Sequence, residues 1–384
     1  MGEKPETKGM AGRPGKSRRT LPFAALCLAA ALILLAAGCG GKPAPGDKVG
    51  DGVAEKRLTV VASFYPLYDF AAKIGGDDAD VVNLVPAGVD SHDWSPKLQD
   101  MRQISEADLF LYLGAGYEGW VDDFLGALAP GEGPLVVEAS RGADLIRLSG
   151  DGKAHSATDG DGRGHDDGDG HGHEDGDHDD GDHDDGDHDD GEHDGGEDGH
   201  GHNHDHDHLA RDTDPHVWLS PKQALVLADN IKKAFIGADP ENRTDYEARH
   251  ERLKAQLLDL DARMTKVAAE AKRKTFIVSH ESFGYLARDY GLTQIGVMGL
   301  APDAEPTLGK LEEIRDEARR LGIRYILFEE LVSPKVAETL AGSLGIDTLV
   351  LNPLEGLTEE QLSAGEDYFT VMERNLTTLA VALE

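Results

Sequence analysis

Histidine is the residue through which this 384-residue chain could do chemistry, and its seventeen copies fall into two groups. Thirteen lie between residues 151 and 208, in a tract that repeats the unit GDHDD. The other four are His92, His216, His250 and His280. Imidazole nitrogens are ligands of zinc, copper, iron and nickel, so both groups predict metal binding.

The cysteines limit the kind of metal site that the chain can build. Cys27 and Cys39 are the only two, and both lie within the first forty residues. The rest of the chain therefore has no thiolate ligand and no disulfide. A metal bound there must use nitrogen and oxygen ligands.

Three of the isolated histidines lie in loops or at element ends, and two of them, His92 and His280, lie where a parallel α/β protein binds its ligands. His92 stands in the loop AGVDSHDWSP after a predicted strand, and His280 closes the strand TFIVSH. His216 stands in TDPHVWLSP, just before a predicted helix. Ligands of open parallel sheets bind beyond the carboxyl ends of the strands. Three imidazoles and an oxygen would form a tetrahedral site suited to Zn²⁺, although a histidine taken alone is more often satisfied by a backbone hydrogen bond.

The elements that must position these residues alternate between strands and helices. In the first half, strands are predicted over residues 57–64, 79–86, 107–114 and 134–140, and helices over 66–74, 96–105 and 120–128. After residue 212 another helix runs through Ala234. This alternation is typical of βαβ units around a parallel sheet.

A long helix joins this half to a second one of the same kind. Between Glu241 and Lys274, mostly apolar residues recur at alternating steps of four and three and form one stripe along a predicted helix. They are Tyr246, His250, Leu253, Leu257, Leu260, Met264, Val267 and Ala271. His250 lies on this stripe, so we interpret it as structural. Further strands are predicted over 275–280, 292–298, 323–330 and 346–351. The predicted fold class is therefore α/β, with two parallel-sheet lobes joined by one long rigid helix.

The N-terminus has the features of an export signal followed by a tether. Basic residues precede an apolar run, Leu21 to Ala37, that ends in LLAAGCG. This ending resembles the lipobox of bacterial lipoproteins, in which Cys39 would be acylated and become the mature N-terminus. We expect residues 1–39 to be a lipoprotein signal peptide, exported by the Sec or the Tat route, and 40–56 to be a flexible tether. The protein would then be extracytoplasmic, lipid-anchored to the outer face of the cell membrane, or periplasmic.

The folded part is predicted to have an N-terminal lobe over 57–240, a linking helix over 241–274 and a C-terminal lobe over 275–384. The tract 151–208 interrupts the first lobe and carries −21 of the chain's formal charge of −35. Its low apolar content predicts disorder, and the acidic balance excludes nucleic acid as a partner.

The histidines of this tract predict weak, exchangeable metal sites that raise the local zinc concentration or sense zinc excess. The alternative is a solvated acidic linker without a metal role. The auxiliary sites would involve His178, His183, His188, His193, His200, His202, His204, His206 and His208.

Four motifs resemble those of the metal-binding lipoproteins of bacterial ABC importers for zinc and manganese. They are SHDWSPKLQDMRQISEADL, DPHVWLSP, VSHESFGYLARDYGL and FEELVSPKVAETLA, in this order, with an acidic His-rich insertion before the second. The resemblance covers about residues 57–384 and implies the metal-type periplasmic-binding-protein fold. It also implies that His92, His216 and His280 are metal ligands from both lobes.

The resemblance places the fourth ligand in the loop LNPLEGLT, residues 351–358. Manganese-type members have an Asp where this chain has Asn352, whereas Glu355 resembles the carboxylate of zinc-type members. Glu355 is therefore the expected ligand, with Asn352 or a water as alternatives. Asp93, Asp212 and Asp214 either orient the imidazoles or cap turns.

The expected function is high-affinity capture of Zn²⁺ between the lobes and its delivery to an ABC permease with its ATPase. Three histidines and at most one carboxylate favour zinc over manganese. A manganese importer component is one alternative; an extracellular zinc buffer and a zinc hydrolase are others, although no HExxH pair is present. We expect a monomer that is not an enzyme and that reaches the membrane through its lipid anchor.

Overall fold

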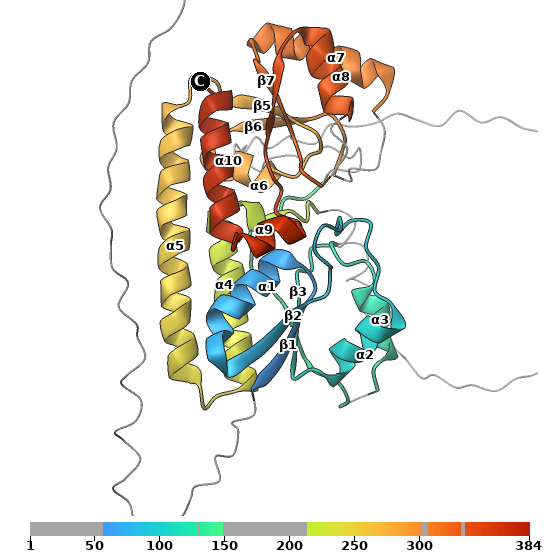
Figure 1. Ribbon diagram of the computed structural model, residues 1–384, viewed down its shortest axis with the longest axis vertical. Helices are drawn as coiled ribbons and strands as arrows, with labels where there is room; N and C mark the ends of the chain where they lie inside the picture. Colours follow the sequence, from blue (N-terminus) through green and yellow to red (C-terminus); the bar gives the residue numbers. More distant parts are fainter. Residues whose placement is uncertain (1–56, 130, 149–212, 301–305, 332–334) are drawn as a thin grey trace, which may run out of the picture. The chain divides into compact units, whose positions relative to one another are not determined.

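Two sheets of four parallel strands form the centres of two lobes (Figure 1). The computed structural model describes residues 57–129, 131–148, 213–300, 306–331 and 335–384. The predicted signal peptide with Cys39, the predicted tether and the whole tract 151–208 lie outside these residues. No helix in the described part is long and apolar enough to cross a membrane.

The N-terminal sheet has the strand order β2-β1-β3-β4. Its strands are β1 (Leu58–Ala62), β2 (Ala79–Asn83), β3 (Leu109–Tyr112) and β4 (Leu135–Glu138). Alternate residues face opposite sides of the sheet. Val60 and Ala62 join the core under α1 (Tyr65–Gly75) and α4 (Pro221–Ala238), whereas Val61 joins the core under α2 (Leu98–Glu106) and α3 (Val121–Ala127).

The C-terminal sheet repeats this order as β6-β5-β7-β8. Its strands are β5 (Thr275–Val278), β6 (Thr293–Gly296), β7 (Tyr325–Phe328) and β8 (Asp347–Val350). Ile277 and Ile326 pack under α7 (Leu308–Leu321) and α8 (Lys335–Leu344). The other face lies towards α6 (Gly284–Tyr290) and α10 (Tyr368–Ala382), with α9 (Glu359–Ser363) preceding α10.

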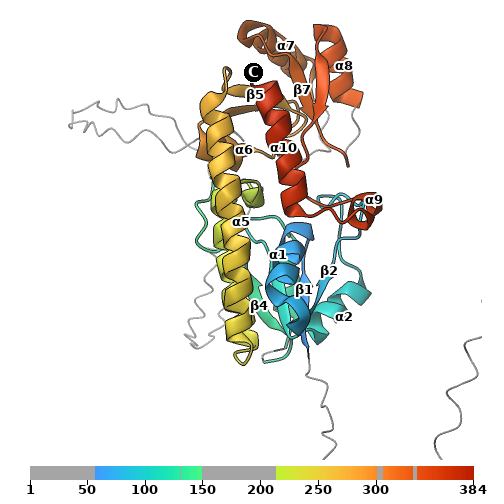
Figure 2. The ribbon, with the colours of Figure 1, turned by 60° about the vertical axis from the view of Figure 1, so that its left-hand side comes forward.

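The long helix α5 (Arg243–Glu270) runs along both lobes (Figure 2). It packs against α1 and α4 of the N-terminal lobe and against α6 and α10 of the C-terminal lobe. It is shorter than the expected 241–274, because the chain turns at Ala271 and the next two backbone N–H groups donate to the Leu383 carbonyl. The expected stripe residues Val267 and Ala271 pack half-buried against the core, and Ala268 beside them is buried, since a straight helix drifts away from a strict repeat of seven.

One apolar core continues through both lobes. It joins strand residues of the first sheet, the buried side of α5 and strand residues of the second sheet such as Phe276 and Val278. The described residues accordingly belong to a single compact unit. The carboxyl ends of β2, β5 and β8 lead into loops that meet between the two sheets, and this is where the candidate site lies.

Candidate metal centre

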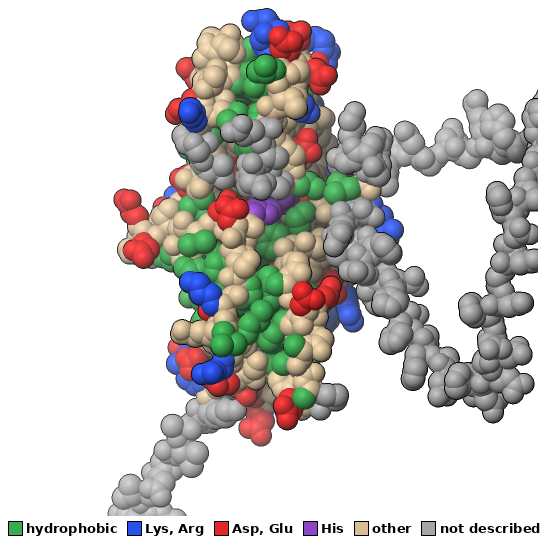
Figure 3. All heavy atoms as spheres, turned by 90° about the vertical axis from the view of Figure 1, so that its right-hand side faces the viewer, with side chains coloured by type: hydrophobic (Ala, Val, Ile, Leu, Met, Phe, Trp, Pro, Cys, Tyr) green, Lys and Arg blue, Asp and Glu red, His purple; other side chains and the backbone are tan. Residues whose placement is uncertain are grey.

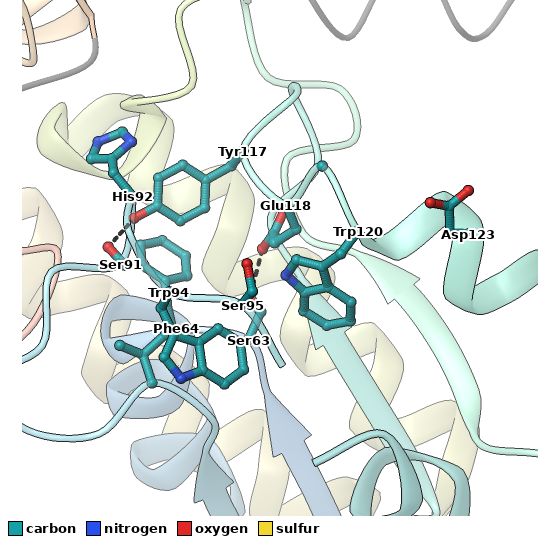
Figure 4. Close-up of a pocket in the computed structure, with 12 residues that line it drawn as sticks. Ser63, Phe64, Ser91, His92, Trp94, Ser95, Tyr117, Glu118, Trp120 and Asp123 are labelled. Atoms are coloured by element: carbon teal, nitrogen blue, oxygen red, sulfur yellow. Dashed lines mark hydrogen bonds between the residues drawn. The ribbon is translucent and has the colours of Figure 1, made fainter. Parts of the chain in front are cut away.

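His92 comes from the loop after β2. Its backbone N–H donates to Asp90 Oδ1 at 2.9 Å, which fixes the turn, and its ring lies edge-on against Tyr117 with 5.5 Å between the ring centres. The Tyr117 hydroxyl is hydrogen-bonded to Ser91 (Figure 4). The His92 side chain is 18% exposed, so it is the member of the site that solvent reaches.

His216 lies at the N-cap of the short 3-10 helix Val217–Leu219 and is fully buried. Asp214 Oδ1 accepts both its backbone N–H, at 2.9 Å, and its ring Nδ1–H, at 2.8 Å. This carboxylate therefore holds the imidazole so that Nε2 points to the centre of the site. Of the three aspartates considered as orienting residues, Asp214 has this role; Asp93 is exposed, and Asp212 lies outside the described residues.

His280 follows β5 and is also fully buried. Its Nδ1–H donates to Glu329 Oε1 at 2.6 Å, and the same oxygen accepts from the Ser279 hydroxyl. Glu329 is itself buried and comes directly after β7. The sequence prediction missed this residue. The available signal was an acidic pair at the end of an apolar strand, in the motif FEELVSP.

Glu355 lies in the loop after β8, and this loop is fixed by Asn352. The Asn352 side-chain oxygen accepts from the Leu354 backbone N–H at 2.7 Å, and the Asn375 amide holds both backbone groups of Asn352. Leu354 takes a left-handed backbone conformation with φ 57°, which turns the chain into the site. Asn352 thus shapes the loop, and Glu355 joins the three histidines.

The four side chains converge on one point. The Nε2 atoms of His92 and His216 are 3.3 Å apart, and those of His216 and His280 are 3.4 Å apart. Glu355 Oε1 lies 3.2, 3.6 and 3.5 Å from the Nε2 atoms of His92, His216 and His280. Ligands at the corners of a tetrahedron with metal bonds of about 2.0–2.1 Å are about 3.3–3.4 Å apart. These five of the six distances between ligand atoms fit four-coordinate zinc, and all four atoms lie within 4.8 Å of one another.

In the neutral site, the hydrogen bonds around it use the Nδ1 protons of the buried histidines, so the Nε2 atoms at its centre have no proton to donate. In the neutral rings of His216 and His280, the proton lies on Nδ1, where Asp214 and Glu329 accept it. Their Nε2 lone pairs then face each other and the Glu355 carboxylate at less than 4 Å. Such acceptors repel one another unless protons or a cation lie between them.

The pKa values show which of these groups gain protons when no cation is present. Burial alone lowers the pKa of His216, but hydrogen bonds to Asp214 and Glu355 outweigh it and raise the pKa. Burial likewise opposes the hydrogen bonds to Glu329 and Glu355 that raise the pKa of His280 to about 10. Burial raises the pKa of Glu355, but hydrogen bonds from the imidazoles bring it well below its usual range. An entering cation must displace the protons.

A cavity of about 380 Å³ opens beside His92 in the N-terminal lobe (Figure 4). Tyr117 and Trp120 contribute to its wall, together with Glu118, whose carboxylate accepts from the Ser63 hydroxyl at 2.6 Å. Burial raises the pKa of Glu118. Among the described histidines only His92 is not buried, and Figure 3 shows histidine surface where the two lobes meet. The cavity thus connects solvent to the edge of the site.

The remaining predicted residues do not join this group. His250 is buried on α5 against α4, with Nε2 4.0 Å from Asp229, in agreement with its interpretation as a structural residue. The histidines of the tract lie outside the described residues. Within the described part, the four ligand atoms of His92, His216, His280 and Glu355 form the group whose members all lie within 4.8 Å of one another.

Residues 60–382 match the sequence model of a family described as ZnuA, zinc-uptake complex component A, periplasmic. The chain belongs to this family. The zinc uptake protein ZnuA of Bacillus subtilis is 36% identical over 363 residues, which cover 94% of this chain and 98% of that protein. The zinc-binding protein AdcA of Streptococcus pyogenes serotype M3 is 37% identical over 332 residues, or 86% of this chain. This chain spans 57% of the length of that relative.

Solved structures show the same two-lobed architecture. The metal-dependent lipoprotein YcdH of Bacillus subtilis aligns with a TM-score of 0.63 at 34% identity, covering 85% of this chain and 99% of that one. The Zn(II)-bound ZnuA-like domain of Streptococcus pneumoniae AdcA aligns with a TM-score of 0.63 at 31% identity, again over 85% and 99%. The predicted family and the predicted α/β fold are both confirmed.

Proposed function

We propose that this chain captures one Zn²⁺ with His92, His216, His280 and Glu355 and delivers it to an ABC permease for import. The observation that carries this proposal is the spacing of the four ligand atoms, five of whose six distances match the edges of a zinc tetrahedron. The names of its relatives, a zinc-binding protein and a zinc uptake system protein, support the same cargo.

The ligand types favour zinc over manganese. Three imidazoles and one carboxylate suit Zn²⁺, whereas Mn²⁺ prefers oxygen ligands in an octahedral arrangement. Asn352 stands where a manganese-type site would have a second carboxylate, and its side chain is engaged in shaping the loop.

The same geometry argues against a zinc hydrolase. A catalytic zinc keeps one coordination position open for water or substrate. Here the protein itself would supply all four ligands, and Glu355, whose Oε1 faces the Nε2 atoms of all three imidazoles, would be one of them. Capture and release of the ion agree with this arrangement better than turnover does.

We further propose that the protein works outside the cytoplasm, held at the membrane by a lipid on Cys39. The relative from Streptococcus pneumoniae is named a zinc-binding lipoprotein, and the family description says periplasmic. A permease and its ATPase would be the partners, with this chain as a monomer. Growth of a deletion strain in zinc-poor medium separates this role from that of a zinc buffer, since loss of an importer component stops uptake.

The test measures tight zinc binding by competition with a chelator that strips weaker sites from the full chain. The unmodified protein should retain one Zn²⁺, and His216→Gln and His280→Gln should lose it. His250→Gln is the matched control, because it changes a buried histidine outside the site. Stoichiometric tight zinc in both site variants would overturn the proposal.

A further inference from the structure

Trp218 contacts the segments that hold three of the four proposed ligands, His92, His216 and Glu355. It lies in the segment between the lobes, two residues after His216, and is fully buried. Its ring centre is 5.3 Å from that of His216. The hydroxyl of Tyr368, at the start of α10, donates to its backbone carbonyl at 2.7 Å.

The Trp218 indole also reaches the loop of the fourth proposed ligand. Its Nε1–H donates to the Pro353 carbonyl at 2.8 Å, two residues before Glu355. The bond links residues 135 positions apart in the sequence, and both partners are buried. It therefore fixes the distance between the His216 segment and the Glu355 loop.

A third contact extends this arrangement to His92. The ring of Tyr117 lies edge-on against Trp218, with 5.2 Å between centres, and also lies edge-on against His92. Phe64 packs against the other two aromatic rings, with centres 4.7 Å from Tyr117 and 4.8 Å from Trp218. Rigid rings at such distances leave little room for one ligand to move without the others.

We propose that Trp218 is a positioning residue that sets metal selectivity, by holding the Glu355 loop at tetrahedral distance from His216. This inference rests on the proposed function. Zn²⁺ fits a tetrahedral site with short metal–ligand bonds. Mn²⁺ prefers an octahedral site, so the four ligands would have to move apart to admit further oxygen ligands. A loop fixed by the indole resists that spreading. Without the indole N–H, the site tolerates both ions more equally.

A buried tryptophan needs an acceptor for its N–H in any protein, so the test must separate selectivity from stability. Trp218→Phe in the full chain keeps a ring and removes the donor. Tyr246→Phe is the matched control, since it also keeps a buried ring and removes its donor, here the hydroxyl that donates to Asp239 away from the site. Dissociation constants for Zn²⁺ and Mn²⁺ are measured by chelator competition, and the Co²⁺ spectrum is recorded at one equivalent.

We expect Trp218→Phe to weaken Zn²⁺ binding about 10–100-fold, as for other changes just outside a metal's ligands. Mn²⁺ binding should change little, so that the ratio of the two affinities falls about tenfold or more. The visible Co²⁺ absorption, which is strong only in a tetrahedral site, should weaken. Tyr246→Phe should behave as the unmodified protein in all three measurements.

Other outcomes distinguish the two proposals. A lower melting temperature with unchanged selectivity and Co²⁺ spectrum would show Trp218 to be structural only, and the proposed function would stand. Absence of tight zinc from the unmodified chain would instead remove the proposed function.

If Trp218→Phe does not fold, Tyr368→Phe loosens the same residue and should shift selectivity in the same direction. In the unmodified chain, the Trp218 indole N–H resonance should shift with one equivalent of Zn²⁺, and an unshifted signal would contradict the proposal.

Discussion

The two buried imidazoles of the candidate site are each fixed through the nitrogen that faces away from its centre. Asp214 holds Nδ1 of His216, and Glu329 holds Nδ1 of His280. A charged acceptor in this position makes the imidazole a stronger ligand and fixes its orientation. The strength of the proposed site therefore depends on residues that do not touch the ion.

Glu329→Gln tests this dependence. The change keeps the size of the side chain but removes the charge that holds His280. We expect the zinc affinity to fall about 10–100-fold. The exposed Glu338 provides the control, and Glu338→Gln should leave the affinity unchanged. Chelator competition measures both, and an unchanged affinity in Glu329→Gln would mean that Glu329 has no influence on the ligand.

Proton competition predicts a pH dependence of zinc binding. The pKa values of His216 and His280 are raised in the folded protein without metal, that of His280 to about 10. Zinc must displace these protons, so its apparent affinity should rise with pH across the neutral range, about tenfold per pH unit for each proton released. Isothermal titration in buffers of different ionisation enthalpy counts the protons. An affinity that is flat between pH 6 and 8 would contradict this prediction.

The stability of the metal-free protein should depend on pH in the opposite sense. A raised histidine pKa contributes stability below about pH 6.5, the unfolded value, and this contribution is lost as pH rises through the folded pKa. The lowered pKa of Glu355 contributes stability above its unfolded value and loses it only in strong acid. Denaturant titrations without metal should thus give falling stability from pH 6.5 upwards.

At the scale of elements, α5 provides the surface on which both lobes pack. Its buried stripe contacts helices of each lobe, and its other side faces solvent. The helix is therefore held by tertiary packing more than by its own propensity.

Two neighbouring leucines on α5 test this packing. Leu257 is fully buried and Leu258 is 46% exposed. Leu257→Ala should destabilise the protein by about 2–5 kcal/mol through the cavity that it leaves. Leu258→Ala should change the free energy of unfolding by about 0.5 kcal/mol or less. Denaturant unfolding measures both, and equal effects of the two changes would contradict the predicted orientation of the stripe.

At the scale of the whole molecule, a continuous core joins the lobes beside the site. Residues of both sheets and of α5 belong to it. A wide hinge movement would break this core, so we expect metal release to need small shifts of loops and lobes. The exposed side of His92 is the place where such a shift costs least packing.

Removal of residues 151–208 separates the proposed tight site from the tract. The shortened chain should keep one tightly bound Zn²⁺, because the four proposed ligands lie outside the deleted segment. It should bind fewer weakly held Zn²⁺ ions than the full chain. Replacing the thirteen histidines of the tract by Asn, at unchanged length and charge, is the matched control and should give the same result. Loss of the tight zinc in either variant would contradict this division.

The sequence by itself determined the layout of elements and the type of chemistry. Alternating apolar strands and helices predicted both lobes, because strand and helix periods are local properties of the chain. The lack of cysteine after residue 39 restricted metal ligands to nitrogen and oxygen. Helix ends were less accurate, since they depend on contacts such as that with Leu383.

The family resemblance named Glu355 as the expected carboxylate and Asp214 as one of three candidates beside the histidines, but only the tertiary structure decided among the alternatives and added Glu329. Glu355 lies 263 residues after His92 and 3.2 Å from it, a juxtaposition that no local pattern encodes. Whether Asn352 or Glu355 faces the site depends on the turn at Leu354, and Glu329 meets His280 because β5 and β7 are neighbours in the sheet. Such contacts follow from the packing of distant segments, and spacing along the chain carries no information about them.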